Sequence, residues 1–401
     1  MAGTEGISVG ANDALSAPNS TSAFEPNTLL PDGSGAANGA PPGGPPAPGV
    51  GTTSLAVSLA DASIYLVYVP IFSASGTLSA VTSDLPRIAG LGFTTLFVMP
   101  ITPIGTATDR HPAFKSPYAV ADYYGIAANL GTAADFTALV DRAHALGMQV
   151  ILDVVLNHTA WTNPLVNQHP EYYVHTDGNA GNSSSIAQAF TYADVAQLDY
   201  KTPGNGLFEY MNTMLQWWMA THHVDGFRFD SADNPAGAGR MIPAPVWAAL
   251  GNALTAINPN VILLGEEQSP DLALKPFNLD YGWSLNSAVA AATANQSAAG
   301  IRTAQLNLKA NFPTGALHTS IMQNWDMDAD LQRYHGADGT LAAAIFNYTS
   351  DGVPLLFAGE EVGNDNSSNN TRTVVNWNAP LSQRFTSFYA ALGALRRSHA
   401  A

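Results

Sequence analysis

Acidic side chains close apolar, strand-like runs at three widely separated points of this chain. Asp230, Glu266 and Asp326 each end such a run, as in Gly226-Phe-Arg-Phe-Asp230. In a parallel barrel the residues at the carboxyl ends of the strands face one mouth, so these carboxyl groups are expected to converge there. A proton donor, a carboxylate nucleophile and a carboxylate that holds the substrate are groups that cleave a glycosidic bond. The spacing therefore predicts a sugar-cleaving enzyme.

The neighbours of two of these acids predict different protonation states. Arg228 and Asp230 are two residues apart on one expected strand, so both side chains point to the same side. A nearby guanidinium lowers the pKa of a carboxyl, so Arg228 is expected to keep Asp230 ionised, as a nucleophile requires. Glu266 stands beside Glu267, which is expected to raise the pKa of Glu266, as a proton donor requires. A salt bridge between strands is the alternative for Arg228 and Asp230, and Glu267 could be the exposed member of its pair.

Apolar runs alternate with helical patterns from residue 64 to the last helix near 382–397. Continuous apolar strands that alternate with helices predict a parallel sheet covered on both faces. The number of repeats, near eight, favours a closed (β/α)8 TIM barrel over an open doubly wound sheet. We expect strands at 64–70, 94–100, 149–154, 224–229, 261–265, 319–323 and 353–357.

Composition excludes several classes of partner. The net charge of −16 argues against nucleic acid, because binding to phosphates needs clustered Lys and Arg. There is no cysteine, which excludes disulfides and thiolate nucleophiles. No apolar run approaches the length of a membrane span. A neutral polyol such as a glucan is compatible with an acidic protein.

Residues 1–57 differ in composition from the rest of the chain. Gly, Ala, Pro, Ser and Asn dominate there, and such a segment cannot bury enough apolar surface to offset its ordering entropy. We therefore expect a disordered leader. No signal peptide is visible at Met1, while the leader and the acidic surface favour a secreted or periplasmic protein.

Several motifs, in the right order from about Ile64 to Arg397, resemble the alpha-amylase family, glycoside hydrolase family 13. The segments 153–158, 226–230, 264–266 and 323–326 resemble its four characteristic sequence regions. Further likeness lies in 116–124, 130–136 and 352–361. The resemblance implies a (β/α)8 barrel at 58–158 and 204–401, with a short inserted domain at 159–203. The β-sandwich that usually follows the barrel in this family is expected to be absent.

Carried over by position, the resemblance implies a retaining mechanism. Asp230 would be the nucleophile, Glu266 the general acid and base, and Asp326 the residue that binds sugar hydroxyls and distorts the ring. Retention requires the carboxyl groups of Asp230 and Glu266 to lie roughly 5–5.5 Å apart.

The resemblance also implies the residues that surround these acids. Arg228 would orient Asp230, and Asp153 would be a structural carboxylate that pairs with Arg228. Tyr118 would stack under the sugar at the cleavage subsite, and His158 would donate a hydrogen bond to the primary hydroxyl of the sugar.

Departures from the family pattern concern substrate contacts and metal. Trp325 stands where the family usually has histidine, so contacts to the sugar hydroxyls would be remodelled, because an indole has one donor and no acceptor. The chemistry requires no cofactor. Calcium could use Asn157 as a ligand, but Gln197 stands where many members place a calcium-binding aspartate, which argues against the family's usual calcium site.

The leading interpretation is a retaining hydrolase of α-glucosidic bonds in maltodextrin, maltooligosaccharide or starch-type glucans. A transglycosylase or a trehalose-synthase-like enzyme of the same fold is an alternative, since it differs only in the acceptor that reaches the intermediate. A non-catalytic glucan-binding protein is a third interpretation, which Trp325 motivates and the set of retained acids opposes. The sequence does not indicate an oligomeric state.

Overall fold

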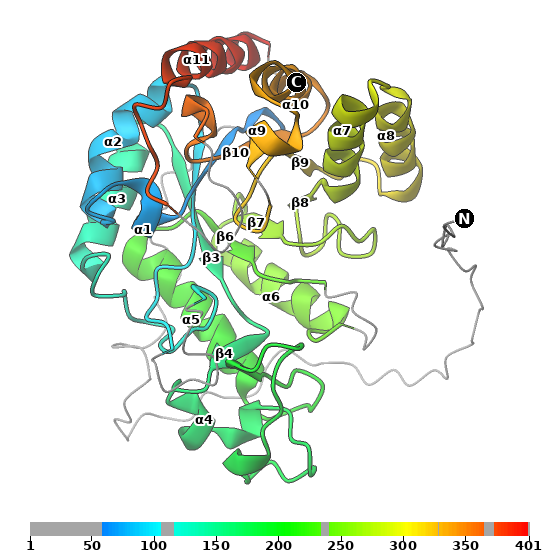
Figure 1. Cartoon of the computed structure of the whole chain (residues 1–401). Helices are drawn as coiled ribbons and strands as arrows, with labels where there is room; N and C mark the ends of the chain where they lie inside the picture. Colours follow the sequence, from blue (N-terminus) through cyan, green and yellow to red (C-terminus); the bar gives the residue numbers. More distant parts are fainter. Residues whose placement is uncertain (1–57, 106–115, 234–239, 328, 365–372, 400–401) are drawn as a thin grey trace, which may run out of the picture. The chain divides into compact units, whose positions relative to one another are not determined.

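The computed structural model describes residues 58–105, 116–233, 240–327, 329–364 and 373–399 (Figure 1). The expected leader, 1–57, lies outside the described residues. Within the described ranges, eight parallel strands close into a barrel in the order β1-β10-β9-β8-β7-β6-β3-β2. The expected TIM barrel is therefore confirmed. The strands are β1 (Ile64–Val67), β2 (Thr95–Val98), β3 (Gln149–Val154), β6 (Gly226–Phe229), β7 (Ile262–Gly265), β8 (Leu279–Tyr281), β9 (His318–Ile321) and β10 (Val353–Phe357).

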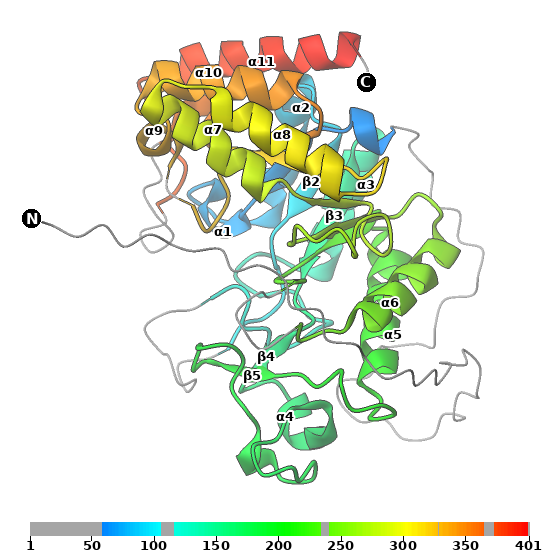
Figure 2. The same cartoon turned by 90° about the vertical axis from the view of Figure 1, so that its right-hand side faces the viewer.

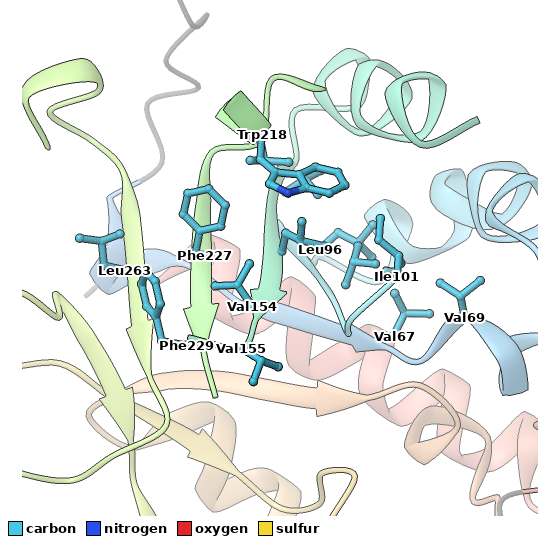
Figure 3. Packing of buried hydrophobic residues seen from close by; sticks show 14 of the residues in the cluster. Val67, Val69, Leu96, Ile101, Val154, Val155, Trp218, Phe227, Phe229 and Leu263 are labelled. Carbon is cyan, nitrogen blue, oxygen red and sulfur yellow. The ribbon is translucent and has the colours of Figure 1, made fainter. Parts of the chain in front are cut away.

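Side chains alternate between the two faces of the barrel wall because successive residues of a strand point to opposite sides. Ile151 and Leu264 belong to the cluster that fills the barrel interior. Phe227 and Leu263 belong to the cluster between the strands and the outer helices. Figure 3 draws part of this outer layer, in which Trp218 of helix α5 lies among the strand residues. The same alternation fixes which polar residues face the barrel axis.

Helices cover the outside of the barrel. The long ones are α2 (Leu78–Gly90), α3 (Ala133–Ala145), α5 (Leu207–His222), α6 (Ala244–Ile257), α7 (Trp283–Asn295), α8 (Ala299–Asn311), α10 (Ala337–Thr349) and α11 (Ser382–Ser398). Thr132 begins α3 with a capping box, in which its hydroxyl accepts from the Asp135 N–H while the Asp135 carboxylate accepts from the Thr132 N–H. No helix of the described residues is long and apolar enough to cross a membrane.

The stretch from β7 to α7 departs from the regular repeat. Residues 266–278 connect β7 to β8 without a helix, and two helices, α7 and α8, follow β8 and pack side by side (Figures 1 and 2). Neither β8 nor α7 was among the elements predicted from the sequence. The strand has only three residues with Asp280 at its centre, so it forms no apolar run, and α7 is rich in alanine around its whole circumference.

The segment after β3 forms a small unit of its own. Strand β4 (His158–Ala160) pairs antiparallel with β5 (Val195–Gln197), and the short helix α4 (Leu165–Gln168) lies between them in sequence. This unit stands away from α7, α8, α10 and α11 (Figure 2). It occupies the place expected for the inserted domain, whose exact bounds stay a prediction, as does the absence of a C-terminal β-sandwich.

A glycine permits the close approach of the two strands that carry the site. Gly226 begins β6 beside Ile262 of β7. A Cβ atom on Gly226 would stand 2.0 Å from the Ile262 carbonyl oxygen. Any larger side chain would therefore push β6 and β7 apart.

Candidate active site

Asp153 and Arg228 occupy inward-facing positions on neighbouring strands. They are register partners across β3 and β6, one residue away from outward-facing Leu152 and Phe227. Asp230 follows Arg228 by two residues and therefore faces the same side. Glu266 follows inward-facing Leu264 by two residues at the end of β7. The expected convergence at the carboxyl ends of the strands is thus present.

Arg228 connects three carboxyl groups. Its Nη1 lies 2.8 Å from Asp153 Oδ1 and 3.2 Å from Asp230 Oδ1, and its Nη2 lies 2.8 Å from Glu266 Oε2. The guanidinium is buried, with a side chain only 2% exposed. Because Asp230 and Glu266 contact one guanidinium, they lie at the same end of the barrel. Their expected separation of roughly 5–5.5 Å stays a prediction.

Burial and Arg228 shift the pKa values of these acids in opposite directions. Three carboxylates against one guanidinium would leave uncompensated negative charge in a buried place, which favours protonation. Burial raises the pKa of Asp153 to about 8, with Arg228 opposing the rise. Burial likewise raises the pKa of Asp230, although Arg228 pulls that pKa down. The expected effect of Arg228 on the pKa of Asp230 is present, but burial outweighs it.

The pKa of Glu266 is raised, though not by the expected neighbour. Burial is the main cause, and the charge of Asp230 adds to it, while Arg228 opposes it. Glu267 is 2% exposed and accepts a hydrogen bond from the Ser269 N–H. The alternative in which Glu267 is the exposed member of the pair is therefore wrong.

Ser231 turns the chain immediately after Asp230. Its φ of +44° is a left-handed conformation that a non-glycine residue rarely adopts. In this conformation the Ser231 N–H donates to Glu266 Oε2 at 2.7 Å. Strained backbone of this kind clusters at functional sites, where surrounding contacts enforce it. The turn therefore places one strained backbone donor on Glu266, a contact that the sequence did not indicate.

Tyr118 and Asp326 lie beside this cluster. The Tyr118 hydroxyl donates to Asp153 Oδ2 at 3.3 Å, and the Arg228 guanidinium stands 5.6 Å from the centre of the Tyr118 ring. Burial is the main cause of the raised pKa values of Tyr118 and Asp230, and the charge of Asp326 adds to both. Asp326 is exposed at the mouth, and its N–H donates to Asn324 Oδ1 at 2.9 Å. The third expected carboxylate thus stands on the solvent side of the other acids.

His158 is placed differently from its expected role. Its Nε2 lies 3.1 Å from the Tyr118 carbonyl oxygen, which can only accept a hydrogen bond. Burial lowers the pKa of His158 to about 4, so the ring is neutral and its single proton belongs on Nε2. The remaining nitrogen, Nδ1, is an acceptor. The expected donation from His158 to a sugar hydroxyl is therefore not supported by this arrangement.

Trp325, which stands where the family usually has histidine, packs against another aromatic ring. Its ring is 6% exposed and meets the Tyr68 ring edge-on at 4.3 Å between centroids. Both rings contact the cluster that fills the barrel interior. Trp325 therefore adds apolar packing to the barrel interior, where a histidine could have offered hydrogen bonds, and its expected contact with substrate stays a prediction.

The described residues offer little to a resident metal. Asn157 Nδ2 donates to the Asp230 carbonyl oxygen at 2.8 Å, while its Oδ1 is buried without a hydrogen-bond partner. That oxygen is a possible ligand. However, no group of three or more His, Cys, Asp or Glu side chains within the described ranges could hold a metal ion. Calcium takes six to eight oxygens, including amide and backbone carbonyl oxygens, so calcium at Asn157 stays a prediction and no chemical step is assigned to it.

Tyr281 is a member of the site that the sequence analysis missed. Its ring is 1% exposed, and the Arg228 guanidinium stands 5.7 Å from its centre. Tyr281 ends β8, the strand without an apolar run. No sequence signal marked it, because its role depends on a strand pairing between β8 and β7.

A closed parallel barrel with an arginine-linked carboxyl cluster at the carboxyl ends of its strands is the architecture of a barrel glycosidase. The comparisons with known proteins make the class specific. Residues 35–244 match the family described as alpha amylase, catalytic domain. The chain belongs to the alpha-amylase family of glycosidases.

Individual relatives agree with this assignment. An alpha-1,4-glucan:maltose-1-phosphate maltosyltransferase from Arcanobacterium haemolyticum is 32% identical over 209 residues, 48% of this chain and 28% of the relative. The chain thus spans less than a third of that protein. Alpha-amylase 3 from Dictyoglomus thermophilum is 24% identical over 82% of this chain and 70% of its own length. A crystal structure of an alpha-amylase from Lactobacillus plantarum superposes with a TM-score of 0.74 at 27% identity, covering 84% of this chain and 80% of that one.

Proposed function

We propose that this protein is a retaining hydrolase of α-glucosidic bonds in maltooligosaccharides and starch-type glucans. The observation that carries the proposal is the single buried guanidinium of Arg228, which contacts both Asp230 and Glu266. One of these acids can then be ionised while the other holds a proton, because Arg228 is the one guanidinium that contacts these carboxyl groups among the described residues. The similarity to alpha-amylases supports an α-glucan as substrate.

The first half-reaction uses both acids. The Asp230 carboxylate attacks the anomeric carbon, and the bond from that carbon to the glycosidic oxygen breaks. Glu266 gives its proton to the departing oxygen, so a shortened glucan leaves and a covalent glycosyl ester of Asp230 remains. Glu266 Oε2 already accepts from Ser231 and contacts Arg228, so the proton belongs on Oε1. Asp326, at the mouth, would bind the sugar hydroxyls.

The second half-reaction releases the sugar. Glu266, now ionised, takes a proton from a water molecule, which attacks the anomeric carbon and frees Asp230. Two inversions at one carbon restore the original configuration. Arg228 would stabilise Asp230 as the ester forms and breaks.

A set of three variants tests this assignment. We expect purified protein to convert maltooligosaccharides into shorter oligomers, measured by chromatography. Asp230→Asn and Glu266→Gln should each lower kcat by about 10²-fold or more. Glu267→Gln is the matched control, since Glu267 is buried and its pKa is raised to about 8, so an amide resembles its neutral form. Equal losses in Glu266→Gln and Glu267→Gln would contradict the assigned roles.

A glycosyl transferase is a second candidate, which the likeness to a maltosyltransferase favours. The acids would act identically, and a sugar hydroxyl would replace water in the second half-reaction. Longer oligomers or trehalose among the products would identify transfer. Binding of maltooligosaccharides without turnover would instead identify a non-catalytic glucan-binding protein.

A further inference from the structure

An aromatic ring outside the expected site packs against the cluster that fills the barrel interior. Trp283 begins α7, two residues after Tyr281 ends β8. The two rings are stacked, with centroids 4.8 Å apart and planes inclined by 19°. Tyr281 covers one face of Trp283 and itself lies against Arg228. Trp283 remains partly exposed, so its accessible surface lies on the other face or at its edge.

Strand pairing places this ring on the side of Glu266. Gly265 of β7 is the register partner of Asp280 of β8, so Glu266 stands level with Tyr281. The Tyr281 N–H donates to the Glu267 carbonyl oxygen at 3.0 Å. The segments that follow these strands are therefore held together beside the proposed acid.

A reciprocal pair of hydrogen bonds anchors Ser284, the residue that follows Trp283. Gln268 Nε2 donates to Ser284 Oγ at 3.1 Å, and the Ser284 N–H donates to Gln268 Oε1 at 3.0 Å. These contacts tie the first turn of α7 to the chain just after Glu266. A ring held in this way loses little freedom when a ligand packs on it, which favours binding.

The direction of the reaction then indicates which sugar meets this ring. The proton donor stands on the side of the leaving group, because it delivers its proton to the departing oxygen. Tyr118 approaches Arg228 from the loop after β2, whereas Trp283 follows β8, so the two rings belong to opposite sides of β6 in the barrel order. Pyranose rings pack their C–H faces on aromatic side chains, which commonly line ligand sites.

We propose that Trp283 is the platform for the glucosyl ring on the leaving-group side of the scissile bond. This inference rests on the proposed function, since it takes Glu266 as the proton donor. In a transfer reaction the same surface would hold the acceptor sugar. Trp283 is thus a substrate-binding residue that favours a sugar over water on the leaving-group side of the scissile bond.

Two substrates that differ only in the leaving group separate this role from a structural one. Maltotriose leaves a sugar ring on this side, whereas α-glucosyl fluoride leaves a fluoride ion that cannot contact Trp283. We expect Trp283→Ala to lower kcat/KM for maltotriose on the order of tenfold, the scale of one lost aromatic contact. Hydrolysis of α-glucosyl fluoride should stay within about twofold of the wild type, and Trp283→Phe should restore most of the maltotriose activity.

Control variants make the outcomes decisive. Phe312→Ala removes another partly exposed ring, which meets His318 edge-on at the opposite, amino end of β9, and should affect neither substrate. Equal losses on both substrates in Trp283→Ala would overturn the proposal. Calorimetric titration of maltotetraose into Asp230→Asn, with and without Trp283→Ala, tests the contact without turnover. If the wild type turns over neither substrate, the proposed function fails. In that case a tenfold loss of maltotetraose affinity on Trp283→Ala would still support the ring contact. An unchanged affinity would overturn it.

Discussion

Replacing Arg228 by methionine removes a buried cation that contacts Asp153, Asp230 and the partly exposed Glu266, while keeping most of the side-chain volume. Hydrogen bonds to charged groups contribute about 1.5–3 kcal/mol each. The substitution also relieves the cost of burying the guanidinium, so the effects do not simply add. Breaking a buried ion pair by removing one partner typically costs about 3–5 kcal/mol. Since the Arg228 side chain is 2% exposed, solvent screening does not reduce this figure. We expect Arg228→Met to lower the free energy of unfolding by about 3–5 kcal/mol at pH 8.

The loss should depend on pH. Without the guanidinium the pKa values of Asp153, Asp230 and Glu266 rise further in the folded state, because burial then acts unopposed. A carboxyl whose folded pKa is raised contributes stability at low pH and loses it as pH rises. The variant therefore loses more stability than the wild type between pH 5 and pH 8. At pH 5 the deficit should shrink to about 2 kcal/mol or less.

Urea denaturation followed by circular dichroism and by tryptophan fluorescence measures both effects, provided that the two transitions coincide. Arg240→Met is the matched control, because Arg240 also contacts two carboxylates, Asp233 and Asp271, but in a partly exposed position. It should lose only about 0–1 kcal/mol. A deficit below about 1 kcal/mol in Arg228→Met at pH 8, or equal deficits at the two pH values, would refute the reasoning.

Two further predictions concern stability. Burial raises the pKa of Asp330 to about 7, and the pKa of Glu360 is raised by burial and by the charge of Asp330. The free energy of unfolding of the wild type should therefore fall as pH rises from about 4 to 7. Over that range the free energy of unfolding of Asp330→Asn, measured by urea titration, should rise relative to the wild type by more than about 1 kcal/mol. A difference between the two proteins that does not change with pH would contradict this. Gly226→Ala should cost about 3 kcal/mol or more, because its methyl group would collide with the Ile262 carbonyl. A thermal midpoint equal to that of the wild type would show that β6 and β7 can separate freely.

The barrel could be predicted where its strands are continuous apolar runs. The strand Val353–Phe357 is buried throughout and was found at its observed bounds. Strand β8 escaped detection because buried Asp280, at its centre, is paired with His318 of β9, a contact that no local pattern announces. Strand β8 is defined by its pairing with the neighbouring strands, and its three residues alone do not predict a strand.

The same distinction applies to the site. The two-residue spacing of Arg228 and Asp230 fixed their common orientation, because strand geometry alone decides it. The cause of the raised pKa of Glu266 could not be found from its neighbour Glu267, since it lies in burial and in Asp230, which the fold brings from another strand. Trp283 gave no signal, because its position depends on the pairing of β8 with β7.

Trapping of the glycosyl-enzyme intermediate tests the central claim most directly. A Glu266→Gln variant incubated with α-glucosyl fluoride should still form the intermediate, since fluoride departs without a proton. It should hydrolyse the intermediate slowly, because the variant lacks the general base. Peptide mass spectrometry should then find one hexose on the peptide that contains Asp230, and none after Asp230→Asn is added. A hexose on Asp326 or Glu267, or full turnover with Asp230 replaced, would contradict a mechanism in which Asp230 is the nucleophile.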